Sequence, residues 1–212
     1  MNISVVLFFL HNVFATALLG GLFAKKSDVV FKSFGIGLLF DAIAFTSWSL
    51  AVMMPSNLFI LVTIGAICFL ISLVFFARTG VLHMSSGIRS AVTALSVLSV
   101  VGVFIVGRYV APADASISAE GFLFFNLTPL VQMCYLFVLS LAAFPAIDAV
   151  TAKLNPTVSM WIKYGLIAEV AGGVLLITTI DSQVLYIAGW VIGIVYFGLW
   201  TTLLLSKTAW HK

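Results

Sequence analysis

Long apolar runs, each separated from the next by a short polar break, are the feature that most constrains this chain. A helix needs about 20 apolar residues to cross the roughly 30 Å hydrocarbon core of a bilayer. Seven runs of about that length occur, at residues 4–24, 29–53, 57–77, 89–110, 121–147, 158–180 and 184–206. They predict an all-α polytopic membrane protein with seven transmembrane helices that form a single domain over residues 1–212.

The composition supports a lipid environment. Only 8% of the 212 residues are charged and 63% are hydrophobic, whereas about a quarter of the residues of a soluble protein are charged. The sequence therefore predicts a multi-pass protein of the plasma (inner) membrane, with the lipid bilayer as a partner and no nucleic acid. The alternating pattern of an outer-membrane barrel is absent. Cys68 and Cys134 both lie inside apolar runs, so no disulfide framework is indicated.

The orientation follows from the basic residues near the ends of the predicted helices. The first, third and fifth breaks and the C-terminal tail contain basic residues, whereas the second and sixth breaks contain none. The fourth break contains Arg108, opposed by Asp114 and Glu120. Cytoplasmic loops of membrane proteins are enriched in Lys and Arg, so we expect the N-terminus outside and the C-terminus in the cytoplasm. The residues concerned are Lys25, Lys26, Arg78, Arg89, Lys153, Lys207 and Lys212.

Three ionisable residues lie well inside the predicted helices. Asp41 is at the centre of the second helix, Glu169 is at the centre of the sixth, and His11 is in the outer half of the first. A carboxylate at mid-bilayer costs at least about 2.5 kcal/mol, so such residues usually face the interior of the bundle. They are candidate substrate-binding or proton-binding residues, with His11 as a partner of Asp41. A buried carboxyl group can also act only as a hydrogen-bonded link between helices.

A weak internal repeat adds to this hypothesis. Shifting the sequence by 128 positions overlays the first three predicted helices on the last three and places Asp41 on Glu169, each four residues after a Gly-Leu pair. The overall identity is near that of two random apolar sequences. A 3+1+3 arrangement of parallel repeats, with a site between them, is a known transporter design.

In topology alone, this arrangement resembles the SWEET-type sugar transporters and the nicotinamide riboside transporters. The Pro-Gln and Trp/Asn signatures of those families are not found here, so no residue role is transferred. The resemblance implies a bundle of two helix triplets joined by a linking helix.

We therefore expect a small transporter or permease with a midplane carboxylate site, linked to a small solute or a proton. A sensor or receptor module that acts through a partner is the alternative, and an accessory subunit of a membrane complex is another. The sequence is compatible with a homo-oligomer and with binding to a membrane partner protein. No catalytic residue, metal site or cofactor is predicted, since a bis-histidine haem site and a retinal lysine are both missing. Arg108 is interpreted as an anchor or as part of an external vestibule, and Trp48 as an interfacial residue.

Overall fold

The computed structural model describes residues 3–110, 114–119, 121, 123–157, 159–160, 163–164, 167 and 170, without the side chains of residues 3–9, 11 and 15. Within this part of the chain, five α-helices and two short strands follow one another. A 3₁₀ turn (η1) precedes the third helix and a π-helical turn (η2) ends the fourth. Their bounds are α1 Ile3–Ala24, α2 Val29–Met53, η1 Pro55–Asn57, α3 Leu58–Gly80, α4 Ser86–Ile105, η2 Val106–Val110, β1 Asp114–Ile117, β2 Leu123–Asn126 and α5 Pro129–Thr151.

Four of these helical segments are long and apolar enough to cross a membrane. They are α2, α3 together with η1, α4 together with η2, and α5. The first three predicted spans agree with α1, α2 and α3 to within a few residues. The predicted spans 158–180 and 184–206 lie outside the described residues except for isolated positions of the sixth. The seven-helix count and the repeat therefore stay predictions.

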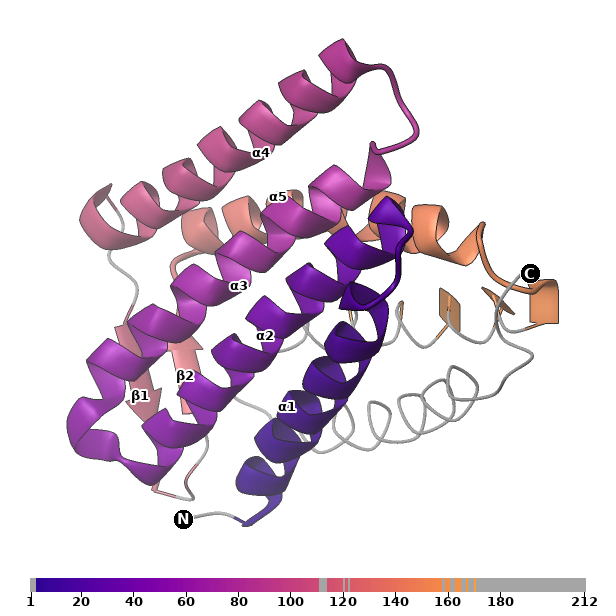
Figure 1. The fold of residues 1–212 in the computed structure, drawn as a ribbon. Coiled ribbons are helices and arrows are strands. Elements are labelled where there is room, and N and C mark those ends of the chain that lie inside the picture. The colour runs from indigo at the N-terminus through magenta and orange to yellow at the C-terminus, as the bar shows by residue number, and fades with distance from the viewer. Residues whose placement is uncertain are drawn as a thin grey trace.

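The helices form a layered bundle. Figure 1 shows α1, α2 and α3 side by side in one row, with α5 behind α3 and α4 along the outer side of α3. Helix α2, in the middle of the row, differs sharply from α4. Most of the side chains of α2 are buried, whereas Val103 is the buried residue of α4. An apolar helix that packs so little against its own chain needs lipid or a partner around it.

Local signals explain where α2 begins and ends. Asp28 precedes it in an extended conformation, and its Oδ1 accepts hydrogen bonds from the backbone N–H groups of Val30 (2.8 Å) and Phe31 (3.4 Å). This cap satisfies donors that the first turn of a helix leaves without partners. At the other end, Pro55 follows Met54 and starts the 3₁₀ turn that leads into α3. Proline disfavours helical geometry in the residue before it, so α2 ends there.

The fifth predicted span, 121–147, begins too early. Residues 123–126 form strand β2, which pairs with β1 in an antiparallel hairpin with Asp114 opposite Asn126 and Ile117 opposite Leu123. Gly121 lies in the connecting turn with a φ of 84°, a conformation that favours glycine. Helix α5 begins only at Pro129, which occupies the first turn, and continues to Thr151. Proline suits that position because no intrahelical donor is needed there.

The helix ends near the α1–α2 turn pack very closely. A Cβ atom added at Gly35 of α2 would lie 2.7 Å from the carbonyl oxygen of Gly20 and would also meet the backbone N of Ala24. A Cβ at Gly80 of α3 would lie 2.9 Å from the carbonyl carbon of Pro145 in α5. Helix backbones can approach this closely only where a side chain is missing. The glycines therefore bring α1 against α2, and α3 against α5.

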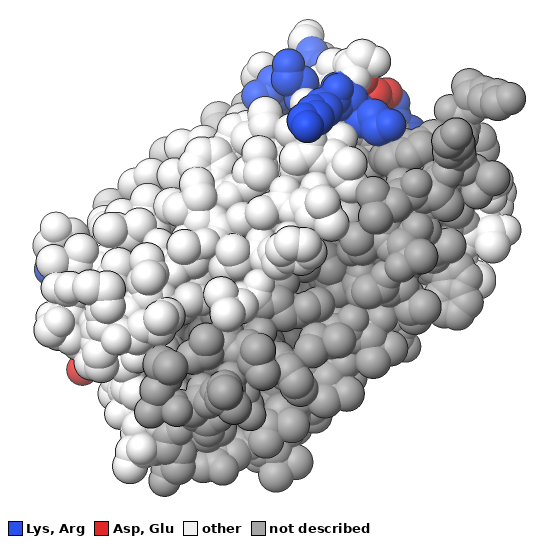
Figure 2. Space-filling model, turned by 60° about the horizontal axis from the view of Figure 1, so that its bottom comes forward, with Lys and Arg blue, Asp and Glu red and all other residues white. Residues whose placement is uncertain are grey.

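Charged groups gather at this same end, which we call the basic end. It contains the α1–α2 turn, the α3–α4 connection and the C-terminal end of α5, and Figure 2 shows Lys and Arg side chains clustered there. Lys153 forms an ion pair with Asp28 and so joins the end of α5 to the start of α2. Partial burial alone would raise the pKa of the Asp28 carboxyl, but the Lys153 ammonium and the two N–H groups of the cap hold that pKa below its usual value.

Candidate functional site

Asp41 lies at the middle of α2 and its side chain is only 8% exposed. Gly37, one turn before it, packs against Phe76 of α3, and Trp48, two turns after it, packs against Gly65 of α3. Residues separated by four and seven positions lie on the same face of a helix. Asp41 therefore belongs to the face of α2 that packs on α3, inside the protein and away from the lipid-facing side.

The other two predicted site residues cannot be placed beside it. Glu169 lies outside the described residues, and so does the side chain of His11. The backbone of His11 belongs to α1, which packs along α2. Whether Asp41 and Glu169 share one site, and whether His11 contacts Asp41, therefore stay predictions.

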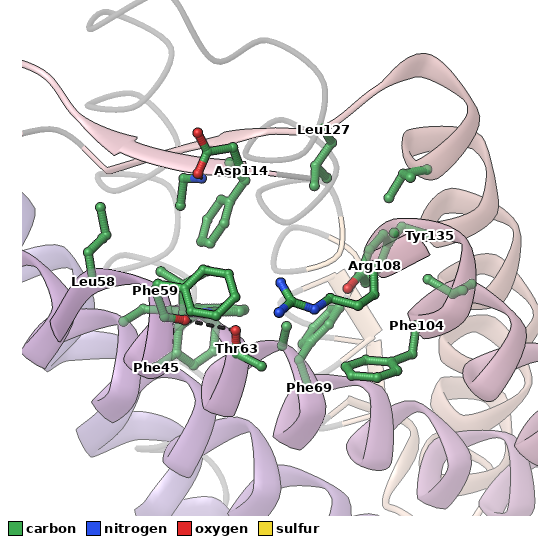
Figure 3. A pocket seen from close by; sticks show the side chains of 18 of the residues that line it. Phe45, Leu58, Phe59, Thr63, Phe69, Phe104, Arg108, Asp114, Leu127 and Tyr135 are labelled. Atoms are coloured by element: carbon green, nitrogen blue, oxygen red, sulfur yellow. Dashed lines mark hydrogen bonds between the residues drawn. The ribbon is translucent and has the colours of Figure 1, made fainter. Parts of the chain in front are cut away.

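A cavity of about 390 Å³ lies at the end of the bundle opposite the basic end. Its walls come from the C-terminal half of α2, the N-terminal half of α3, the end of α4 with η2, the hairpin, and the first turns of α5. Figure 3 shows the hairpin passing over the side chains that line it. Ligand pockets in proteins have volumes of about 300–1,000 Å³, so the cavity could hold a small organic molecule.

Aromatic rings form part of the cavity wall, and Trp48 packs against several of them. Its indole packs edge-on against Phe125 of β2 (centroids 5.1 Å apart) and against Phe45 (5.5 Å), and it is tilted against Phe69 of α3 (5.9 Å). The ring of Phe69 in turn contacts the ring of Tyr135 in α5, with the two centroids 6.4 Å apart. Such ring pairs add to the energy of apolar burial. They fix the shape of the wall where three helices and the hairpin meet.

The polar groups of the cavity are few. The Arg108 guanidinium carbon lies 4.6 Å from the centre of the Phe59 ring, in cation–π geometry. The hydroxyl of Thr63 donates a hydrogen bond to the Phe59 carbonyl (2.7 Å). Asp114 lies at the rim, where its Oδ1 accepts the N–H of Ala115 (2.7 Å). In Figure 3, Arg108 extends into the cavity over Phe59, while the carboxylate of Asp114 points away from the guanidinium.

The cavity and Asp41 are neighbours along α2. Phe45, which lines the cavity, follows Asp41 by four residues, so the carboxyl group is about 6 Å deeper along the helix axis. Asp41 itself is not part of the cavity lining. A solute in the cavity would lie one helical turn above the buried carboxyl group.

Sequence reasoning identified Asp41 but missed the cavity. Trp48 was interpreted as an interfacial residue, and that interpretation is wrong, because the side chain is 9% exposed and forms the inner wall. Arg108 was interpreted as an anchor or as part of an external vestibule; it lines the cavity, and whether that cavity faces the outside stays a prediction. The available signal was the accumulation of aromatic residues at one end of successive runs, but such residues are also common at membrane interfaces.

Within the described residues, no group of three or more His, Cys, Asp or Glu side chains could hold a metal ion. Cys68 and Cys134, both partly buried, are free thiols. The candidate site therefore consists of Asp41 and the aromatic cavity above it.

No family model matches the sequence of this chain, and no curated protein matches it either.

Proposed function

We propose that the protein is a small multi-pass membrane transporter or permease in which Asp41 is a proton-linked site. The observation that carries the proposal is a carboxyl group that is 8% exposed in the middle of an apolar helix, on the face turned to α3. Burying a carboxyl group among apolar helices is costly, so proteins keep one where it serves a purpose. A carboxyl group can take up and release a proton, which an amide side chain cannot do.

The arrangement of charge supports an orientation for this transporter. In the proposed topology, seven helices cross the plasma (inner) membrane, and the basic end lies in the cytoplasm because cytoplasmic loops are rich in Lys and Arg. The aromatic cavity then opens on the outer side, and a solute that enters it comes to lie above Asp41. Glu169, at the matching place in the proposed 3+1+3 repeat, would complete the site from the other triplet, with His11 beside Asp41.

The experiment is solute uptake into proteoliposomes. A panel of labelled sugars, nucleosides, amino acids and organic acids is offered with and without an inward proton gradient. We expect one class to be taken up faster with the gradient than without it. Asp41→Asn and Glu169→Gln should each abolish the effect of the gradient while the protein still folds, because the amides keep hydrogen-bonding capacity but cannot take up a proton in this range.

Thermal denaturation separates this role from a purely structural one. If Asp41 serves only as a link between helices, Asp41→Asn should lower the melting temperature and leave uptake per folded molecule unchanged. Thr46→Val is the matched control, because Thr46 lies on the same helix but on its exposed side. Uptake with an unchanged gradient effect in the Asp41→Asn, Glu169→Gln double variant would rule out the proton-linked mechanism.

A membrane sensor is the second candidate, and the cavity favours it. Its volume of about 390 Å³ is in the range of ligand pockets, and a β-hairpin passes over it at one end of the bundle. A sensor would bind its ligand and hand the signal to a partner protein, without net movement of the ligand. Saturable binding with no uptake by proteoliposomes would favour the sensor over the transporter.

A further inference from the structure

Arg108 brings to the cavity a positive charge that forms no ion pair with any residue that the structure describes. The ion pairs found in this part of the chain join Lys153 to Asp28 and Lys163 to Asp148. Asp114 also lines the cavity, but its carboxylate lies at the rim and points away from the guanidinium (Figure 3). A guanidinium has five N–H donors, and the ring of Phe59 occupies only one of its faces. Donor capacity therefore remains inside the cavity.

Tyr135 of α5 adds a second donor beside Arg108. Its ring is held by contact with Phe69, and Figure 3 shows its hydroxyl oxygen turned into the cavity that Arg108 enters. Within the described part of the chain, no side chain or carbonyl group accepts a hydrogen bond from this hydroxyl. It can therefore donate one to a group that enters the cavity.

The backbone of η2 shapes the path of Arg108 into the cavity. Residues Val106–Val110 form a π-helical turn that continues α4. This turn is wider than an α-helical one, and π-helical turns are rare and often found at functional sites. Together with Val103 and Phe104, the residues Gly107 and Arg108 line the cavity. The wide turn thus allows two turns of one helix to present residues to the same space.

We propose that this cavity binds a small organic anion with an apolar or aromatic body. The anionic group would accept hydrogen bonds from Arg108 and Tyr135, and the body would lie among Trp48, Phe69 and Phe125. A cation is disfavoured because the guanidinium already supplies a positive charge there. A neutral ligand would leave that charge unpaired beside apolar walls. The anion would lie in the cavity, one helical turn above Asp41, and its binding there does not depend on whether the protein transports it.

The shared chemistry, an anionic group with an apolar body, is also that of an anionic phospholipid. The size of the cavity favours the free acid. A volume of about 390 Å³ suits a molecule of one or two rings better than a headgroup with two acyl chains. The experiment must therefore test the two sources separately.

The first measurement uses the wild-type protein in nanodiscs of zwitterionic lipid, with empty nanodiscs as the blank. Isothermal titration calorimetry with 2-naphthoate, 2-naphthamide and 2-naphthylmethylammonium compares an anion, a neutral molecule and a cation of nearly the same shape. We expect saturable binding of the naphthoate that is about tenfold tighter than that of the amide, with the cation weakest. Equal binding of the three probes, or no binding of the naphthoate, overturns the proposal without any variant.

The second measurement uses variants. Arg108→Gln should weaken naphthoate binding by about tenfold or more, Arg108→Lys should restore part of it, and Tyr135→Phe should weaken it by a few-fold. Arg89→Gln, on the basic end of α4, is the matched control and should bind as the wild type does. Naphthoate affinity that is unchanged in folded Arg108→Gln overturns the assignment of Arg108.

Nanodiscs that contain phosphatidylglycerol distinguish the two sources. If the free acid is the ligand, added phosphatidylglycerol should leave the naphthoate affinity within a few-fold of its value in zwitterionic lipid. If naphthoate binding disappears as phosphatidylglycerol is added, a lipid headgroup occupies the site and the free-acid proposal is overturned.

Discussion

The two ends of the bundle are built in opposite ways. At the basic end, backbones touch: Gly35 lies against α1 and Gly80 against Pro145 of α5, and the ring of Phe23 is fully buried. At the other end, aromatic side chains meet across a space of about 390 Å³. The same apolar composition therefore gives a closely packed end and a hollow one. The difference lies in where glycine removes side chains and where large rings keep backbones apart.

Glycine itself has a different neighbour at each end. Around Gly35 the nearest atoms belong to the backbone of α1, which cannot move without moving the helix. Around Gly65, by contrast, the nearest atoms belong to the indole of Trp48, a side chain that can shift toward the cavity. Close packing is less easily relaxed where backbone meets backbone. The same glycine-to-alanine change should thus cost more at the basic end than at the cavity end.

The largest effect is expected for Gly35→Ala. The added methyl group would lie 2.7 Å from the Gly20 carbonyl oxygen, so α1 and α2 must separate, at a cost of about 3 kcal/mol or more. Unfolding in detergent mixtures measures this change. Gly21→Ala is the matched control on α1, because nothing lies within 4 Å of its added methyl, and it should be neutral or slightly stabilising. Equal stability of the two variants would contradict the close backbone approach.

A smaller effect is expected for Gly65→Ala at the cavity end. The added methyl group would lie 2.6 Å from Cδ1 of Trp48, so the indole must turn away from α3, at a cost of about 1–2 kcal/mol. The same unfolding assay should show a loss, and the tryptophan fluorescence should change because the indole enters a different environment. Gly102→Ala on α4 has open space around its added methyl, so it should change neither the stability nor the tryptophan fluorescence. If Gly65→Ala lost as much stability as Gly35→Ala, the two ends of the bundle would not differ in how easily their packing relaxes.

The smallest effect is expected for the Asp28–Lys153 ion pair. Its side chains are 36% and 41% exposed, so Asp28→Asn, which keeps a capping side chain, should cost less than about 1 kcal/mol. Because the pKa of Asp28 is lowered in the folded protein, its contribution is present above the unfolded pKa. That contribution is lost as the pH falls through the folded value.

This pH dependence is tested by measuring the free energy of unfolding from neutral to acidic pH. The wild type should lose its advantage over Asp28→Asn as the solution becomes acidic, and the two curves should converge at low pH. Asp148→Asn, which removes the more exposed partner of Lys163, serves as the control for loss of a surface ion pair without a helix cap. If the wild type instead became more stable relative to Asp28→Asn as the pH falls, the predicted direction of the pH dependence would be wrong.

The helices were predictable because their signals are local. A run of apolar residues, the Asp28 cap and the proline after Met54 place α2 without knowledge of any neighbour. The burial of Asp41 was expected on similar grounds, since the cost of a carboxylate in lipid depends only on its depth. In contrast, the start of α5 was misplaced because Leu123–Asn126 is as apolar as a helix. Thr128 and Pro129, a typical cap and first turn, were the better signal.

The cavity could not be predicted because it belongs to no single segment. Trp48 and Phe69 come from neighbouring helices, Phe125 from a strand, and Tyr135 from a helix much further along the chain. No spacing in the sequence records that these rings converge. A tryptophan near the end of an apolar run has the same local pattern whether it faces lipid headgroups or a cavity wall. Only tertiary packing distinguishes the two.

The hairpin over the cavity depends on the helices for its stability. A two-stranded ribbon is marginal by itself in water, and this one is held by Leu123, which is 2% exposed and packs with Trp48 and Val52 of α2. The hairpin therefore depends on the helices beneath it, whereas the helices at the basic end are held by contacts of their own backbones. The part of the cavity wall that the hairpin supplies rests on this contact of Leu123 with α2.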